Sequence, residues 1–187
     1  MKKLLSIGLV GLCSVTLVAC GGNSDNSKSE TKKENSSTEN VKVPDSKNTK
    51  AYFKDDTLKI EMATLKILST EVLPADSSLY RDKPQLAFTY EVTNDSEEPI
   101  SASSVWIACF QATQDGENTI NKLDVGMTPQ DEKFNEFKEH QNDDIKPGGT
   151  VKDVIAYDLD DTTSSVVLKA TQGISGSDLG EKKIELK

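Results

Sequence analysis

The chain has 187 residues, of which 35% are hydrophobic and 5% aromatic, and its 31 acidic residues outnumber its 22 basic ones to give a formal net charge of −9. This length accommodates one domain of ordinary size. The negative charge argues against nucleic-acid binding, which needs concentrated Lys and Arg, and against direct docking on anionic lipid.

The amino terminus has the three zones of a secretory signal. Lys2 and Lys3 form the basic end, an apolar stretch follows over residues 4–18, and the small residue Ala19 stands at the expected cleavage point. The apolar stretch is shorter than the roughly 20 residues that a membrane-spanning helix needs. We therefore interpret residues 1–19 as a cleaved signal peptide rather than as a transmembrane anchor.

The signal ends in "LVAC" at residues 17–20, which resembles the lipobox of bacterial lipoproteins at every position. The resemblance implies that the Cys20 thiol is diacylglycerated and that the signal is cut between Ala19 and Cys20. It implies a protein of the Gram-positive envelope, held on the extracytoplasmic face of the membrane by two or three acyl chains, which anchor firmly where one chain binds reversibly. An ordinary signal peptide, or a pheromone released from residues 13–19, are the alternatives.

The next thirty residues, up to residue 50, are almost entirely Ser, Asn, Thr, Lys, Glu, Asp and Gly, with Val41, Val43 and Pro44 as the main interruptions. Such a composition buries too little apolar surface to offset the entropy lost on ordering. We predict a disordered tether over residues 20–50, with a root-mean-square span on the order of 30 Å, that holds the following domain just above the membrane.

Alternating hydrophobicity from residue 51 onward predicts β-strands. "LAFTYEVTN" (86–94) indicates a half-buried strand, and "SVWIACFQA" (104–112), which is apolar on both faces, indicates a central strand. Three more strands are predicted in the second half of the domain, in "TVKDVIAYDL" (150–159), "SVVLKAT" (165–171) and "KKIEL" (182–186).

Two segments depart from this simple alternation. In "LKIEMATLKIL" (58–68) the apolar positions change from even to odd, so we expect a bulge or a crossing between sheets near Ala63. In "TPQDEKFNEFKEHQ" (128–141), Thr128 as N-cap and Pro129 in the first turn predict a short helix inserted between strands.

Six or seven mostly antiparallel strands predict an all-β sandwich over residues 51–187 with one short helical insertion. Several of its stretches resemble small lipoprotein domains of unknown function of the DUF5067 and DUF4352 type, and the resemblance covers roughly residues 58–187. It implies an immunoglobulin-like antiparallel β-sandwich and no particular activity. The stretches that carry it are "FTYEVTNDSEEPIS" (88–101), "FQATQDG" (110–116), "IKPGGTVKDVIAYDLDD" (145–161) and "SVVLKA" (165–170).

Few residues of the domain indicate chemistry. With Cys13 in the signal and Cys20 lipidated, Cys109 is the remaining thiol, and its apolar strand predicts a core residue. His140, the one histidine, is expected on the surface. Five aspartates in turns are interpreted as solvated residues, with calcium binding as the alternative; they are Asp143, Asp144, Asp158, Asp160 and Asp161.

We therefore predict no catalytic residue, no metal site and no cofactor. The sequence favours a non-catalytic binding module for an unknown envelope protein or wall component, with Trp106, Phe134 and Phe137 as a candidate interaction patch if the helical insertion is exposed. A metal-binding or enzymatic domain built on the Asp-rich turns and His140 is the alternative from another functional class. The hypothesis that residues 13–19 are released as a pheromone is a further alternative.

Overall fold

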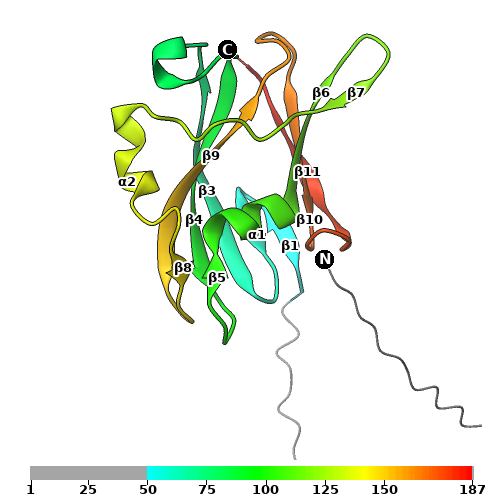
Figure 1. Cartoon of the computed structure of the whole chain (residues 1–187). Coiled ribbons are helices and arrows are strands. Elements are labelled where there is room, and N and C mark those ends of the chain that lie inside the picture. Colours follow the sequence, from blue (N-terminus) through cyan, green and yellow to red (C-terminus); the bar gives the residue numbers. More distant parts are fainter. Residues whose placement is uncertain (1–49, 187) are drawn as a thin grey trace, which may run out of the picture. The chain divides into compact units, whose positions relative to one another are not determined.

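The computed structural model describes residues 50–186, in which antiparallel strands form two main sheets packed face to face (Figure 1). The predicted antiparallel β-sandwich is confirmed. The signal peptide predicted over residues 1–19, the cleavage and lipidation site at Ala19 and Cys20, and the tether up to residue 49 lie outside the described residues.

The larger sheet has five strands in the order β1-β2-β3-β4-β9. The central strand β4 pairs with β3 on one side and with β9 on the other, where Phe88 lies directly opposite Ile155. The strands predicted at residues 86–94 and 150–159 are confirmed as β4 and β9. The bounds in this sheet are β1 (Tyr52–Lys54), β2 (Thr57–Lys59), β3 (Ala63–Leu73), β4 (Gln85–Asn94) and β9 (Thr150–Asp158).

The smaller sheet has four strands in the order β11-β10-β6-β7, and a separate two-stranded pair joins β5 to β8. Leu168 in β10 lies opposite Ala112 in β6 and Lys182 in β11. The predicted strands at residues 165–171 and 182–186 correspond to β10 and the end of β11. The bounds are β5 (Ile100–Ser101), β6 (Phe110–Asp115), β7 (Ile120–Lys122), β8 (Asp144–Ile145), β10 (Val166–Thr171) and β11 (Asp178–Ile184).

The core between the sheets is centred on Trp106, whose side chain has no exposed surface. Its ring centroid lies 4.6 Å from that of Tyr90, 5.1 Å from Phe88 and 4.7 Å from Phe110. The indole N–H donates a 2.9 Å hydrogen bond to the Tyr157 hydroxyl, so the buried polar atom is satisfied. Contacts of this kind tie the segment that carries Trp106 to the larger sheet.

That segment is a helix, and the prediction of a central strand over residues 104–112 is wrong for its first six residues. Helix α1 spans Ala102–Cys109 and lies across one end of the sandwich, at the lower end in Figure 1, and β6 begins only at Phe110. The Ser101 hydroxyl caps the helix by accepting from the Ser104 N–H at 3.4 Å. An apolar run this short fits a strand or a buried helix equally well, so periodicity alone misleads.

The change of phase near Ala63 comes from a hairpin, not from a crossing between sheets. Residues 60–62 form the turn between β2 and β3, and Leu58 lies opposite Leu65 across it. The ladder between β3 and β4 also contains an irregularity, between Ile67 and Ser69, which is five residues later than expected for a bulge. The sequence therefore predicted an interruption of the strand at the correct position, near Ala63, but the interruption is a hairpin turn and not a bulge or a crossing between sheets.

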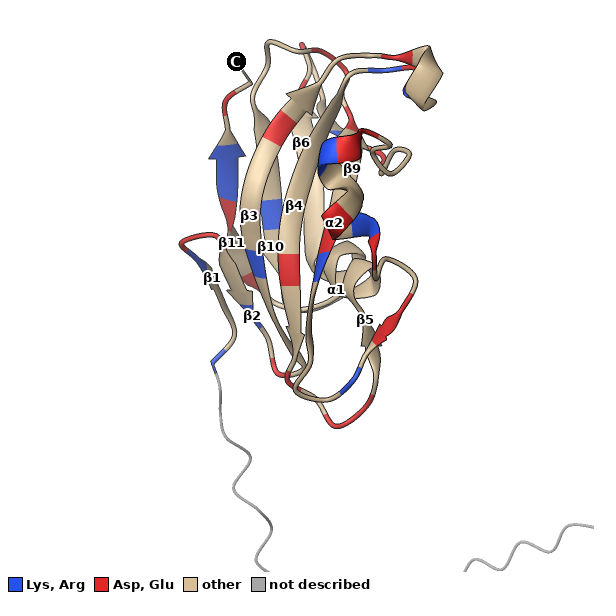
Figure 2. Ribbon diagram, turned by 90° about the vertical axis from the view of Figure 1, so that its left-hand side faces the viewer, with Lys and Arg blue, Asp and Glu red and all other residues tan. Residues whose placement is uncertain are grey.

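The predicted helical insertion is present but starts later than Thr128. A 3-10 turn, η2 (Glu132–Phe134), leads into α2 (Asn135–Lys138), and a further 3-10 turn, η1 (Ser77–Leu79), lies between β3 and β4. The insertion covers the outer face of the larger sheet (Figures 1 and 2). Arg81 pairs with Asp131 at 2.8 Å and holds its start. Strand β4 is consequently buried on both faces, not half-buried as predicted.

Candidate functional site

The three aromatic residues proposed as an interaction patch do not form one. Trp106 is fully buried in the core. Phe134 is 4% exposed and packs in a second apolar cluster, beneath α2, that includes Leu73 and Val154, with Phe137 half-buried beside it. The insertion covers the larger sheet, so Phe134 and Phe137 pack against that sheet and do not form an exposed patch.

Cys109 and His140 lie in different environments and do not pair as a catalytic dyad. Cys109 is 1% exposed at the end of α1, and burial raises the pKa of its thiol. His140 is exposed beyond α2, where its ring nitrogen Nδ1 lies 2.9 Å from an Asp143 carboxylate oxygen, and this hydrogen bond raises the pKa of the imidazole. Burial therefore explains the environment of Cys109, and the hydrogen bond with Asp143 explains that of His140.

The Asp-rich turns are engaged by hydrogen bonds within the chain. Asp158 accepts from the Gln85 amide at 2.8 Å, and Asp160 accepts from the Asn121 amide at 2.9 Å. Asp161 accepts from the backbone N–H groups of residues 163 and 164, and these bonds lower its pKa. Within residues 50–186, no three acidic, His or Cys residues are grouped as metal ligands would be.

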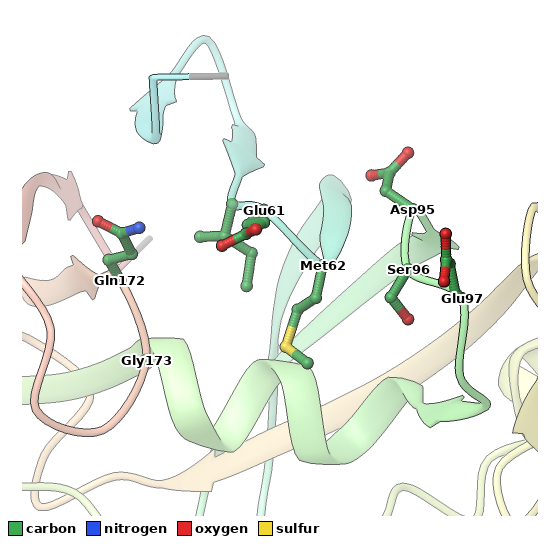
Figure 3. Close-up of a pocket in the computed structure, with 8 residues that line it drawn as sticks. Glu61, Met62, Asp95, Ser96, Glu97, Gln172 and Gly173 are labelled. Atoms are coloured by element: carbon green, nitrogen blue, oxygen red, sulfur yellow. The ribbon is translucent and has the colours of Figure 1, made fainter. Parts of the chain in front are cut away.

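The candidate site is a hollow of about 570 Å³ at the α1 end of the sandwich (Figure 3). Three turns that are far apart in the sequence meet there, namely β2–β3, β4–β5 and β10–β11. Figure 3 shows α1 running below them, with the Met62 side chain directed toward the helix. The lining residues are Ile60, Glu61, Met62, Asp95, Ser96, Glu97, Gln172 and Gly173.

The β2–β3 and β4–β5 turns are joined by hydrogen bonds. The Asp95 N–H donates to the Met62 carbonyl at 3.0 Å, and the Lys59 ammonium group contacts both the Thr64 hydroxyl and the Asp95 carboxylate at 2.7 Å. Partial burial raises the pKa of Asp95, but the hydrogen bonds from Lys59 and Thr64 outweigh it, so the net shift is downward. The Asp95 carboxylate therefore binds a proton less tightly than an ordinary aspartate does.

Asn94 fixes the course of the β4–β5 turn from beneath. Its side chain is completely buried and donates 2.7 Å bonds to the carbonyl oxygens of Glu98 and Ile145. Its own amide oxygen accepts from the N–H and the hydroxyl of Ser96. Its side chain thus bonds within the turn and also to β8, which holds residues 95–97 at the edge of the hollow.

The β10–β11 turn closes the third side. Gly173 adopts a φ of +81°, which favours glycine, and a Cβ there would meet no neighbouring atom within 4 Å. The Thr171 hydroxyl bonds to the Cys109 carbonyl at 3.3 Å and to the Gly173 carbonyl at 2.9 Å, linking this turn to the end of α1. Ile174, the next residue after Gly173, is 90% exposed.

The hollow combines apolar surface with negative charge. Met62 is 46% exposed within it, and Glu61, Asp95 and Glu97 stand at the rim (Figure 3). Asp95 has Lys59 as its partner. Among the described residues, no Lys, Arg or His forms a salt bridge with Glu61 or Glu97. The rim therefore has an excess of negative charge.

The hollow lies at the end of the domain where the chain enters it. Strand β1 begins at Tyr52, which lies opposite Lys59, the residue before the β2–β3 turn. The amino-acid sequence does not reveal this site, because Met62 falls at an alternating apolar position typical of a core residue and the acidic residues are typical of turns. The one usable signal was the single acid, Glu61, among the apolar residues of "IEMA" (60–63).

Comparison with known proteins identifies the family. A family model described as a domain of unknown function, DUF5067, matches residues 23–172, which is most of the chain. The chain belongs to the DUF5067 family. This confirms the DUF5067 part of the resemblance drawn from the sequence. Among curated proteins, no relative matches this DUF5067 chain.

Two solved structures are similar to this DUF5067 protein. A "putative lipoprotein" from Staphylococcus aureus is 25% identical, with a TM-score of 0.64 over 73% of this chain and 92% of its own. A protein from Enterococcus faecalis is 16% identical, with a TM-score of 0.58 over 73% of this chain and 94% of its own, and this likeness concerns the fold alone. Over residues 50–186, no helix is long and apolar enough to cross a membrane.

Proposed function

We propose that the protein is a lipid-anchored protein of the Gram-positive cell envelope and that its immunoglobulin-like sandwich is a non-catalytic binding module. The observation that carries this proposal is the hollow at the α1 end. It has an exposed methionine, two rim carboxylates that form no salt bridge within residues 50–186, and a volume of about 570 Å³, within the usual range of ligand pockets. Its contact partner is an envelope protein or wall component.

The anchor rests on a separate argument. The "LVAC" stretch, with Ala19 before the cleaved bond and Cys20 as the acylated residue, supplies the nucleophilic thiol and the small residues that lipoprotein processing needs. The similarity to the Staphylococcus aureus structure adds support, because that protein is itself described as a lipoprotein. Attachment through Cys20 places the domain on the extracytoplasmic face of the membrane.

The anchor is tested by growing cells that produce the full chain with an alkyne-bearing fatty acid and separating membranes from medium. The wild-type protein is expected to carry the label in the membrane fraction, and Cys20→Ala is expected to carry none. Cys109→Ala is the matched control, because it removes a thiol from the folded domain and leaves Cys20 in place. Label retained by Cys20→Ala would overturn the anchor.

The binding surface is tested by photocrosslinking in the same cells. A photoreactive amino acid is placed at Glu61 or Ile174, on the α1 end, or at Ile120, which is 72% exposed on the β6–β7 hairpin at the opposite end (Figure 1). A discrete adduct is expected from the α1 end and not from Ile120. Equal labelling from both ends, or adducts from Ile120 alone, would refute the assignment of this surface.

A further inference from the structure

The hollow at the α1 end has an apolar floor. Ile60 is 6% exposed and continuous with the core, and Met62 lies beside it with 46% of its side chain exposed. Methionine is unbranched and polarisable, so it adapts to side chains of different shape. A ligand that fills this hollow therefore presents apolar groups to Ile60 and Met62.

Carboxylates stand on both sides of this floor. In Figure 3, Glu61 lies on one side of Met62, and Asp95 and Glu97 lie on the other. Lys59 compensates the charge of Asp95, whereas Glu61 and Glu97 are both exposed and form no salt bridge among the described residues. The complementary ligand has an apolar centre with positive charges on either side.

We propose that the hollow binds a basic peptide segment in which apolar side chains alternate with Lys or Arg. This inference rests on the proposed binding function and names the chemistry of its ligand. The apolar side chains contact Ile60 and Met62, and the cationic groups pair with Glu61 and Glu97. Opposite charges at a rim of this kind contribute mainly to specificity and association rate, so binding is weakened by salt.

The charge of the rim decides between this ligand and other occupants. A second copy of the chain, related by a two-fold axis through the hollow, would bring Glu61 and Glu97 close to the same residues of the partner and be repelled. Anionic lipid would be repelled by the same carboxylates. A basic peptide is attracted by the rim and also covers the apolar floor.

The turns that carry these groups are rigid, which favours binding of a flexible peptide. The Asn94 side chain accepts two hydrogen bonds from Ser96 and donates one each to the Glu98 and Ile145 carbonyls. The Asp95 N–H to Met62 carbonyl bond joins this turn to the β2–β3 turn. Because the rim is already ordered, the loss of conformational freedom on binding falls mainly on the peptide.

The test uses the chain from Gly21 to Lys187, labelled with nitrogen-15, and titrates it with three short peptides. The first is Gly-Lys-Leu-Lys-Leu-Lys-Gly, the second has Glu in place of Lys, and the third has Ser in place of Leu. The first peptide is expected to shift the amide resonances of residues 60–62, 95–97 and 172–173 in a saturable way. The other two are expected to bind much more weakly.

Two double variants identify the contribution of the rim. Glu61→Gln with Glu97→Gln is expected to weaken binding of the first peptide about fivefold and to reduce its dependence on salt. Asp115→Asn with Glu117→Gln is the matched control, because it removes the same charge from the exposed β6–β7 hairpin and should leave the affinity unchanged. Unchanged thermal unfolding of both variants shows that the fold is retained.

Several outcomes would overturn the inference. Equal binding of the acidic peptide, equal binding of the Ser-containing peptide, or shifts confined to other residues would each exclude a basic apolar segment as ligand. Binding to phosphatidylglycerol vesicles through the same residues would identify lipid as the occupant, and concentration-dependent shifts without peptide would identify a second copy. If crosslinking from Glu61 succeeds while the first peptide fails, the binding function stands and only the ligand class is wrong.

Discussion

Tyr90 and Asp153 lie directly opposite each other on β4 and β9, and the Tyr90 hydroxyl donates a 2.8 Å hydrogen bond to the Asp153 carboxylate. Both side chains point into the core, where Asp153 is 1% exposed. Its second oxygen accepts the N–H of Val154 at 2.7 Å. The sandwich therefore contains a carboxylate among its apolar side chains, which is held by two donors and forms no salt bridge within residues 50–186.

This arrangement makes stability depend on pH. Burial raises the pKa of Asp153 although its two hydrogen bonds act in the opposite direction, so the folded-state pKa lies above the unfolded value of about 3.9. The folded state then binds the Asp153 proton more tightly than the unfolded state does. The stability that this proton contributes is lost as the pH rises from the unfolded-state pKa through the folded-state pKa. Asp153→Asn is expected to remove this loss.

The measurement is the free energy of unfolding in urea from pH 4 to pH 8, for the wild type, for Asp153→Asn and for the exposed control Asp115→Asn. Relative to Asp153→Asn, the wild type should lose stability as the pH rises. Relative to Asp115→Asn, it should show no such trend. A difference between wild type and Asp153→Asn that stays constant with pH, or has the opposite sign, contradicts this prediction.

Asn94→Ala is expected to lower the free energy of unfolding by about 2–4 kcal/mol, because it removes the donor to the buried Ile145 carbonyl and the acceptor for the Ser96 N–H. Asn121→Ala is the control, since the Asn121 side chain bonds at the surface to the exposed Asp160 carboxylate and the Thr119 hydroxyl. Asn121→Ala should change the free energy by less than about 1 kcal/mol. Equal losses in the two variants would show that the Asn94 network is not important for stability.

Phe134→Ala is expected to lower the free energy of unfolding by about 2–4 kcal/mol, because Phe134 fills the apolar cluster between α2 and the outer face of the larger sheet. Phe137→Ala should have a smaller effect, since that ring is only half-buried. Trp106 lies on the other face of the sheet, so its fluorescence in the folded state should not change. A loss in Phe137→Ala as large as that in Phe134→Ala would contradict this placement of the insertion.

The Cys109 thiol is expected to be unreactive in the folded domain. It is 1% exposed and burial raises its pKa, so both access and the thiolate fraction are low at pH 8. Reaction of the Gly21–Lys187 chain with Ellman's reagent should be at least about a hundredfold slower in buffer than in urea. Immediate stoichiometric reaction in buffer would place Cys109 at the surface instead.

The alternation of apolar residues was sufficient to predict the long strands, because a strand with one clear apolar face has one register that buries it. The sequences of β4 and β10 show such a face, although the helical insertion also covers the second face of β4. The same alternation misled at residues 102–109. Apolar residues stand there at the spacing of a strand and also at the spacing of a helix, so a buried Trp106 is compatible with either structure. The helix forms because packing at the end of the sandwich buries Trp106 in that conformation.

The hollow could not have been predicted in the same way. Its residues come from three turns separated by tens of positions, and no local pattern brings Glu61, Glu97 and Gly173 together. What joins them is the pairing of β2 with β3 and of β10 with β6, and the position of α1 beneath the turns. Only the complete topology shows that an apolar residue at one turn is flanked by acids from another.

The entry of the chain at the α1 end has a mechanical consequence. Residue 50 leads into β1 beside the β2–β3 turn, so a pull on the amino terminus acts at the same end of the domain as a ligand held in the hollow. Tension between the two points passes through β1, β2 and their connecting turn. The long ladders β3–β4 and β4–β9 lie off this path. For the contacts at Glu61 and Met62, a pull on the proposed anchor would therefore load this edge hairpin and not the central strands.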